Sequence, residues 1–209
     1  MRINPFETCG AEDLAGIAAP DVLMMSKVDW PEQVQRLDAA APAGVDLVPN
    51  LESARGLVRI QEIAGASRRI TALLVASEDM VADLGTGRTR GGEELAYVRS
   101  RFLVECRAAG IEAIDCPYTF SDTSGAVADA RYAKRLGYRM KSLIDPAHAK
   151  AINTVFTPSR AELAKAKKIV AAFEKARAAG KERAKVGGAL IEVPTYAAAK
   201  RLLASVGRS

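Results

Sequence analysis

Two acidic residues, Glu52 and Asp79, each stand at the end of an apolar run that has the length of a β-strand. The runs cover residues 45–53 and 70–79, and a helical pattern follows each of them. In parallel α/β folds, binding and catalytic sites are built at the edge where strands pass into the following helices. Two carboxylates at one such edge, with little His or Cys nearby, suit Mg²⁺ better than zinc.

The sequence therefore predicts a magnesium site formed by Glu52 and Asp79. The alternative interpretation is that both acids only cap helix N-termini or occupy the first turn, where the helix dipole favours negative charge. Residue spacing alone leaves both interpretations open.

Strand-like runs alternate with helical patterns from Arg2 to Asn153. The predicted strands cover residues 2–4, 22–28, 45–50, 70–76, 111–118 and 140–145. The predicted helices cover residues 11–18, 31–40, 53–64, 93–109 and 125–137. Continuous apolar runs indicate strands buried on both faces, and the alternation indicates right-handed βαβ crossovers. These patterns leave a (β/α)₈ barrel or a doubly wound sheet.

Polar residues at most strand ends favour the barrel. They are Lys27, Glu52, Asp79, Tyr118 and Asp145. A doubly wound sheet would instead concentrate its chemistry at one switch point, with a glycine-rich first turn that this sequence lacks. Only six strand–helix units are visible where a barrel needs eight, and the chain begins inside a strand. We therefore expect an α/β fold of the TIM (β/α)₈ type that lacks its first two β/α units.

The pattern changes after Asn153. Ser159 and Glu162 have the spacing of a capping box, and the long helix that they open is expected to stop at Gly180. Residues 187–205 follow as a short extended segment and a small helix, and they are too apolar for a disordered tail. We expect an incomplete barrel over residues 1–157 and a C-terminal helical extension over residues 158–209.

Charge and composition narrow the range of partners. The net charge of +5 is carried by residues 160–185, which have nine Lys or Arg against three Glu, whereas residues 1–159 are net acidic. A solvated helix face explains this excess, so we expect no nucleic-acid partner; contact with an anionic cofactor or a nucleic acid is the alternative. No apolar run approaches the ~20 residues that span a bilayer, so no membrane partner is expected.

The cysteines bear on the cell compartment, and the single histidine bears on the site. Three cysteines without metal-type spacing indicate reduced thiols and a cytoplasmic protein. The single histidine, His148, is expected at the surface, near the start of a helix.

Eight short motifs follow one another along most of the chain. They are Arg-Ile-Asn at 2–4, Ser-Lys-Val at 26–28, Leu-Glu-Ser-Ala-Arg-Gly at 51–56, Ser-Glu-Asp-Met at 77–80, Asp-Leu-Gly-Thr-Gly-Arg-Thr at 83–89, Ala-Ile-Asp-Cys-Pro-Tyr at 113–118, Ile-Asp-Pro at 144–146 and Ile-Asn-Thr-Val-Phe-Thr-Pro-Ser at 152–159. In this order they resemble successive strand ends of the HpcH/HpaI aldolase and citrate lyase β-subunit family of CoA-ester lyases.

The resemblance implies a TIM-type barrel, here with strands 3–8 of the family. It implies an enzyme that uses Mg²⁺ to cleave or form a C–C bond in an acyl-CoA ester of the citryl-, malyl- or citramalyl-CoA type. It also implies a homo-oligomer, a trimer or larger, in which the C-terminal extension packs on a neighbouring subunit.

Individual residues carry the expected roles through the same resemblance. Glu52 and Asp79 match the magnesium ligands, and Arg2 matches the arginine that holds the substrate's carboxylate. Glu52 also lies against the substrate in the family. Glu192 stands where the family usually has an aspartate that serves a neighbouring subunit's site, which implies a catalytic acid or base.

Three functions remain open at this point. The first is the Mg²⁺-dependent lyase with CoA as part of its substrate. The second is a non-catalytic truncated remnant or assembly partner of such a lyase. The third is a CoA-independent aldolase.

Overall fold

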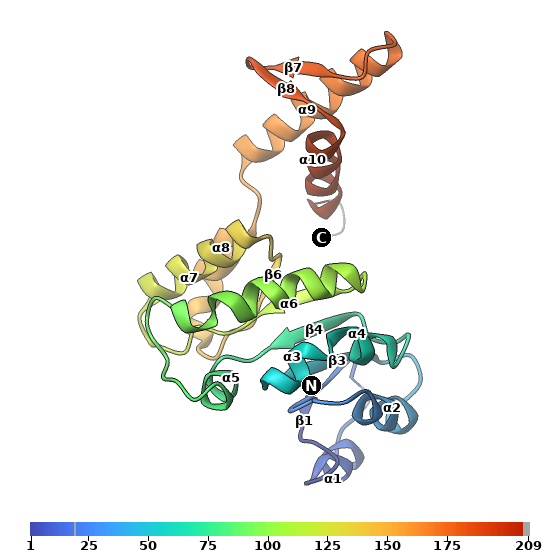
Figure 1. Cartoon of the computed structure of the whole chain (residues 1–209), viewed down its shortest axis with the longest axis vertical. Coiled ribbons are helices and arrows are strands. Elements are labelled where there is room, and N and C mark those ends of the chain that lie inside the picture. The colour runs from blue at the N-terminus through green and yellow to red at the C-terminus, as the bar shows by residue number, and fades with distance from the viewer. Residues whose placement is uncertain (19, 207–209) are drawn as a thin grey trace. The chain divides into compact units, whose positions relative to one another are not determined.

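The computed structural model describes residues 1–18 and 20–206. The chain divides into two compact units, an N-terminal unit of Met1–Phe156 and a C-terminal unit that begins at Thr157 (Figure 1). Each unit has its own apolar core.

The N-terminal unit is built on a six-stranded sheet in which all paired neighbours are parallel. Its strands are β1 (Arg2–Ile3), β2 (Val22–Met25), β3 (Asp46–Leu51), β4 (Ala72–Val75), β5 (Glu112–Asp115) and β6 (Met140–Lys141). Every strand predicted for this unit is therefore present, although most are shorter than the apolar runs from which they were predicted.

Helical segments follow each strand of this unit. They are α1 (Gly10–Ala15), α2 (Pro31–Ala40), α3 (Ala54–Val58), α4 (Ile60–Gly65), α5 (Glu78–Asp83), the 3₁₀ turn η1 (Glu93–Leu95), α6 (Ala96–Ala108), α7 (Thr123–Leu136), the 3₁₀ turn η2 (Pro146–His148) and α8 (Ala149–Phe156). The helix predicted over residues 53–64 is in fact two helices, because Arg59 leaves helical geometry with ψ at 14°.

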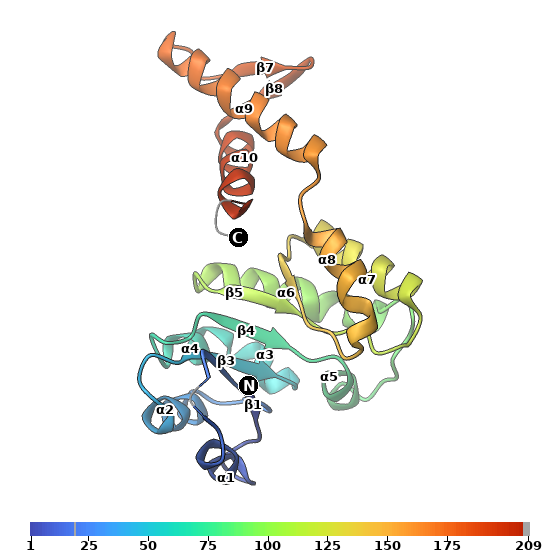
Figure 2. The same ribbon diagram turned by 180° about the vertical axis from the view of Figure 1, so that it is seen from behind.

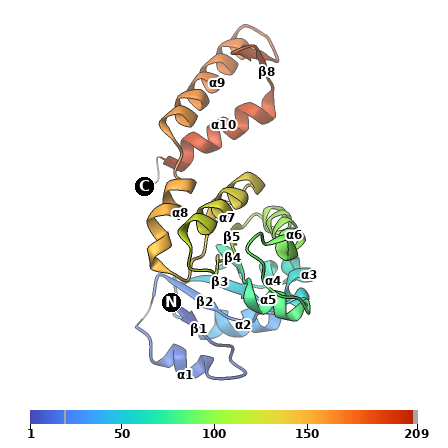
Figure 3. The ribbon, with the colours of Figure 1, turned by 90° about the vertical axis from the view of Figure 1, so that its left-hand side faces the viewer.

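Strand order distinguishes a barrel from a doubly wound sheet. The order is β1-β2-β3-β4-β5-β6, so within the described chain each strand pairs with the next one and the direction never reverses. Right-handed crossovers that always move the same way place their helices on one face of the sheet. Accordingly, α2 packs against α4 and α4 against α6 along that face (Figure 3). This is the topology of a TIM-type barrel, and the prediction of that α/β fold is confirmed.

The two faces of the sheet have different cores, because side chains alternate along a strand. On β3, Leu47 and Leu51 join the large core beneath the helices. Val48 points to the opposite face and joins a small cluster with Ala72 and Leu74 of β4. Figure 2 shows these two neighbouring strands from behind. Residues of this second face, among them Leu74, line the pocket described below.

The C-terminal unit consists of two helices and a hairpin. Its elements are α9 (Arg160–Ala178), β7 (Ala184–Val186), β8 (Ala189–Ile191) and α10 (Val193–Val206). The capping box of Ser159 and Glu162 is present at the start of α9, as predicted. Gly180 follows the end of α9 with a φ of +71°, a conformation that glycine adopts without strain.

Two other observations bear on the expectations from sequence. His148 is buried, with Nε2 3.1 Å from the carbonyl oxygen of Ser121, so its predicted surface position is wrong. The His148 ring, which belongs to η2, packs near the loop before α7, and its centroid is 6.3 Å from the centroid of the Tyr118 ring. None of the described helices is long and apolar enough to cross a membrane.

Candidate active site

A pocket of about 300 Å³ opens at the carboxyl ends of the sheet strands. Each of the six strands, or the residues that directly follow it, contributes to the wall. Arg2, Glu52 and Asp79 all line this pocket, so the structure brings together three of the four residues predicted from sequence. Because the ends of parallel strands meet at one edge of a sheet, residues 77 positions apart in sequence reach the same cavity.

Glu52 directly follows β3 and is buried, with 8% of its surface exposed. Asn50 Nδ2 donates a hydrogen bond of 2.6 Å to Glu52 Oε1, and the backbone N–H of Lys27 donates a second. Burial and the nearby charge of Asp79 raise the pKa of the Glu52 carboxyl, against the opposing effects of Lys27 and Arg2. Glu52 does not cap a helix, because Ser53 caps α3 by accepting from the N–H of Gly56.

Asp79 lies in the first turn of α5, the helix that follows β4, and about half of its side chain is exposed. Lys27 Nζ is 3.6 Å from Asp79 Oδ1. Lys27 is the one described non-glycine residue with a positive φ, 54°, a region that is sparsely populated for such residues. This backbone conformation after β2 accompanies two contacts of Lys27, its N–H with Glu52 and its ammonium with Asp79.

The donor set of Glu52 and Asp79 fits a magnesium ion. Both residues also line a second cavity of about 260 Å³. Glu52 and Asp79 are therefore neighbours in the walls of two cavities. Burial and the charge of Asp79 both raise the pKa of Glu52, and a divalent cation bound between the two carboxylates would stabilise their ionised forms. Among the described residues, no group of three or more His, Cys, Asp or Glu side chains is arranged to hold a metal. Mg²⁺ is usually bound by one or two protein carboxylates, and water and substrate oxygens occupy its other coordination positions.

The remaining wall combines one cation with both polar and apolar residues. Arg2 of β1 supplies a guanidinium, and the apolar residues Leu143 and Ile144, which follow β6, also line the pocket. A planar guanidinium can hold a carboxylate through two parallel hydrogen bonds. The pocket can therefore receive a small organic acid whose carboxylate pairs with Arg2 and whose other groups meet both polar and apolar residues.

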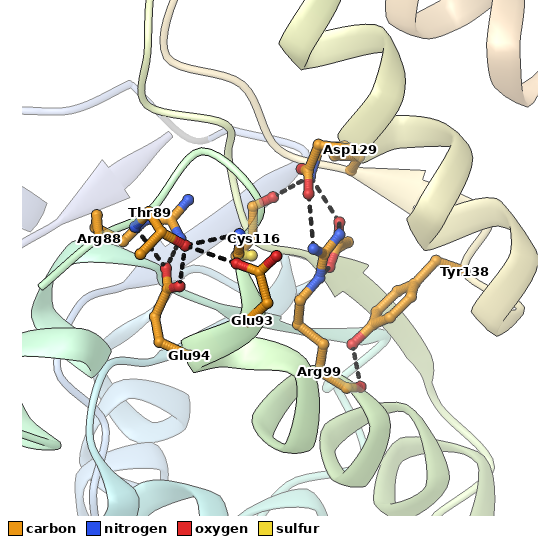
Figure 4. Close-up of polar contacts among 11 residues, drawn as sticks. Arg88, Thr89, Glu93, Glu94, Arg99, Cys116, Asp129 and Tyr138 are labelled. Atoms are coloured by element: carbon orange, nitrogen blue, oxygen red, sulfur yellow. Dashed lines mark hydrogen bonds and ion pairs between the residues drawn. The ribbon is translucent and has the colours of Figure 1, made fainter. Parts of the chain in front are cut away.

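A buried group of charges ties together the elements beside the pocket. Arg99 of α6 binds Asp115 at the end of β5 with two bonds of 2.9 and 2.7 Å, and it reaches Asp129 of α7 at 2.7 Å (Figure 4). Lys141 of β6 lies 2.6 Å from Asp115 and 2.5 Å from Asp129. Two cations thus balance two carboxylates. Burial would raise the pKa of Asp129, but the charges of Lys141 and Arg99 outweigh it and lower that pKa.

This group of Arg99, Asp115, Asp129 and Lys141, the buried charge network, fixes the ends of β5 and β6. Lys141 directly precedes Ser142, which lines the pocket together with the next two residues. Hydrophobic periodicity does not reveal the network, because it joins charges from four elements that are distant in sequence.

A second polar cluster holds the loop between α5 and α6. Glu94 accepts hydrogen bonds from the hydroxyl and N–H of Thr89 and pairs with Arg88 (Figure 4). Burial opposes the charge of Glu94, but these hydrogen bonds outweigh it and lower its pKa to about 2. Arg88 also lies 3.4 Å from Glu78, which lines the pocket. The cluster therefore anchors the loop next to the site.

Glu192, the fourth residue predicted from sequence, lies in the C-terminal unit between β8 and α10. Its carboxylate is half exposed and pairs with Arg183 Nε at 3.0 Å. Glu192 thus belongs to the C-terminal unit, whereas Arg2, Glu52 and Asp79 belong to the N-terminal unit.

Comparisons with known proteins agree with this architecture. The family model of HpcH/HpaI aldolase/citrate lyase matches residues 1–146. Citrate lyase subunit beta of Leuconostoc mesenteroides subsp. cremoris is 31% identical over 97% of this chain and 72% of its own. A (3S)-malyl-CoA thioesterase of Cereibacter sphaeroides is 32% identical over 98% of this chain and 72% of its own.

A solved structure extends the similarity to three dimensions. Protein CitE from Mycobacterium tuberculosis, in complex with magnesium, acetoacetate and coenzyme A, superposes with a TM-score of 0.81 and 28% identity, over 99% of this chain and 77% of that chain. The fold, the sequence match and the position of the pocket lead to one conclusion: this chain belongs to the HpcH/HpaI aldolase/citrate lyase family.

Proposed function

We propose that this chain is a Mg²⁺-dependent CoA-ester lyase that cleaves or forms a C–C bond in a citryl-, malyl- or citramalyl-CoA-like substrate. The observation that carries the proposal is the convergence of Glu52, Asp79 and Arg2 on one pocket at the strand ends. Two carboxylates suited to Mg²⁺ and a guanidinium suited to a carboxylate are what such a substrate requires. The relative crystallised with magnesium, acetoacetate and coenzyme A supports the proposal.

Glu52 and Asp79 would hold the metal, which when bound polarises the oxygen atoms on which negative charge gathers during C–C cleavage. Arg2 would grip the carboxylate next to the reacting carbon and so fix the orientation of the acyl group. The burial of Glu52 and its hydrogen bond from Asn50 hold one metal-binding carboxylate in a fixed position.

The reaction itself is a retro-Claisen or retro-aldol cleavage. The substrate's hydroxyl loses its proton, and the bond from that carbon to the CH₂ beside the thioester breaks. The electron pair remains on the CH₂ carbon as a thioester enolate, which takes up a proton to give the shorter acyl-CoA. The hydroxyl carbon becomes the carbonyl of the 2-oxo acid that leaves.

Proton transfer would fall to Glu192 of a neighbouring subunit, within the homo-oligomer of three or more chains that the family resemblance implies. A carboxyl brought to a closed site can serve as acid or base when burial raises its pKa towards the working pH. The exposed apolar side chains of Leu190 and Val193, on either side of Glu192, support the docking of this unit on another subunit.

Product identity tests the proposal. Citryl-, malyl- and citramalyl-CoA are incubated with the protein in Mg²⁺ and in EDTA, and 2-oxo acid and free CoA thiol are measured in parallel. The proposal predicts formation of 2-oxo acid without free thiol, for at least one ester, in Mg²⁺ only.

Other results would favour a different function. Free thiol without 2-oxo acid would indicate thioester hydrolysis, the activity for which the Cereibacter relative is named. Cleavage of the free hydroxy acids without CoA would indicate the CoA-independent aldolase. A folded protein that turns over none of these compounds would contradict the proposal and favour the remnant or assembly partner.

A further inference from the structure

Two buried oxygen atoms in the wall of the pocket lack hydrogen-bond partners among the described residues. They are Asn50 Oδ1 and Ser77 Oγ, and both side chains line the cavity that also contains Glu52 and Arg2. Asn50 is 4% exposed and Ser77 is 1% exposed. Leaving a buried polar group unpaired is unfavourable, so such groups are uncommon in folded proteins and call for a physical explanation.

The strand geometry explains why Asn50 faces the pocket. Asn50 of β3 and Glu52, which directly follows β3, are two positions apart in extended backbone, so their side chains leave the same face of the sheet. Asn50 Nδ2 donates to Glu52 Oε1 at 2.6 Å, which fixes the orientation of the amide. The amide oxygen is thereby left as an acceptor that can pair only with a donor.

Ser77 reaches the same cavity from the neighbouring strand. It follows β4 at the start of α5, but its hydroxyl makes no capping bond with that helix. A hydroxyl can donate or accept, so Ser77 can satisfy a carboxylate oxygen of a bound acid. The cavity therefore contains an obligate acceptor, a hydroxyl donor and the guanidinium of Arg2.

We propose that Asn50 and Ser77 form a recognition subsite for a hydroxy acid, in which Asn50 Oδ1 accepts from the acid's hydroxyl and Ser77 Oγ donates to a carboxylate oxygen. Asn50 is then a specificity-determining residue that distinguishes a hydroxylated acyl group from its deoxy analogue. A site that hydrogen-bonds a hydroxyl discriminates against the analogue without it, because the acceptor is then left unpaired. The inference relies on the proposed function only for placing this acid within an acyl-CoA ester.

Malate and succinate are suitable probes, because they differ by one hydroxyl group. Their affinities are measured by calorimetric titration of the full chain in EDTA, which removes any preference that a metal would give to the hydroxyl. We expect wild-type protein to bind malate about tenfold more tightly than succinate, the effect of one net hydrogen bond. A repeat in Mg²⁺ measures what the metal adds to that ratio.

Two substitutions separate the roles of the two residues. Asn50→Leu should reduce the malate-to-succinate ratio to about one while succinate binding stays within about twofold of wild type. Ser77→Ala should weaken both acids by a similar factor and leave the ratio unchanged. Ser100→Ala is the matched control: its hydroxyl donates within α6 to the carbonyl of Ala96 and does not line the pocket, so the substitution should change neither affinity.

The outcomes distinguish this inference from the proposed function. Equal binding of malate and succinate by wild type, or an unchanged ratio in Asn50→Leu, would overturn the subsite. An equal loss for both acids in Asn50→Leu would show that Asn50 acts only by holding Glu52. If Asn50→Leu does not fold, Asn50→Ala carries the same prediction. A retained hydroxyl preference in a protein that cleaves no CoA ester would support the subsite and contradict the lyase.

Discussion

At the residue scale, Glu52 combines two properties that both disfavour its ionised form. It is buried, and it shares its surroundings with a second carboxylate, which together raise its pKa. Ionising such a group is unfavourable unless a positive charge compensates for it. Lys27 and Arg2 supply part of that compensation, and a divalent cation at the two carboxylates supplies more.

Glu192 provides a prediction about proton transfer. Glu192→Gln removes the titratable proton but keeps the size of the side chain, so we expect kcat to fall by about 10²-fold or more while KM changes little. Steady-state kinetics with the preferred CoA ester measures both constants. Glu182→Gln, an exposed acid of the same unit, is the control and should leave kcat unchanged. A Glu192→Gln variant with wild-type kcat would exclude the proposed role.

Residue types and spacing were sufficient to predict that Glu52 and Asp79 share a site, because each comes within a few residues of the end of a buried strand. The same rule does not find Asn50, which lies inside an apolar run. A signal was nevertheless present, since Asn50 is two positions before Glu52 and therefore on the same face of the strand. The orientation of its amide depends on a contact that only the structure reveals.

At the element scale, the buried charge network holds α6, α7, β5 and β6 in register beside the pocket. A buried network stabilises a fold only when its charges balance, and removing one partner leaves an uncompensated charge in a medium of low polarity. Lys141 is fully buried at its side chain and contacts both carboxylates of the network.

We therefore expect Lys141→Met to lower the free energy of unfolding by about 3–5 kcal/mol. Adding Asp129→Asn, which restores neutrality with Arg99 and Asp115, should recover part of that loss. Urea unfolding followed by circular dichroism measures both changes. The exposed Lys150→Met is the matched control, with a change of no more than about 0.5 kcal/mol. Equal effects at positions 141 and 150 would contradict the structural role of the network.

Glu94 gives the anchored loop a pH dependence. Its folded-state pKa of about 2 lies below the ordinary value of 4.5, so its ionised form stabilises the fold above pH 4.5. That contribution is lost as the pH falls from about 4.5 towards 2. The difference in free energy of unfolding between wild type and Glu94→Gln should therefore shrink over this range, as measured by urea unfolding at several pH values. A difference that is constant with pH, or one that Glu62→Gln reproduces, would argue against this explanation.

The elements themselves were predictable to different degrees. Continuous apolar runs located all six strands of the sheet, because a buried strand needs few other signals. The β7–β8 hairpin was only half expected: the extended segment around Ile191 was predicted, but its partner strand lies in a basic stretch. Gly187 and Gly188, both with positive φ, form the two-residue turn between them, and this Gly-Gly pair is the signal that indicates a hairpin.

At the scale of the whole molecule, the C-terminal unit has its own core and exposes apolar side chains. Leu190 and Val193 are about half exposed, which is consistent with the proposed docking on another subunit. We expect light scattering after gel filtration to give a mass at least three times the 22.2 kDa of the chain. Leu190→Asp should lower that mass, because it places a charge in the proposed contact. A monomeric wild-type protein would contradict the assembly and, with it, the supply of Glu192 from a neighbour.

The central claim is that Glu52 and Asp79 together form the magnesium-dependent centre of a CoA-ester lyase. The measurement that tests it most directly is the rate of 2-oxo acid release from the preferred CoA ester as a function of Mg²⁺ concentration. It is made for wild type, Glu52→Gln, Asp79→Asn and the exposed control Glu62→Gln. Saturating Mg²⁺ should activate wild type and Glu62→Gln alike, whereas each of the other two variants should lose on the order of 10²-fold or more in rate and require more Mg²⁺. Equal Mg²⁺ activation in all four folded proteins would contradict the assignment of the metal to these two carboxylates.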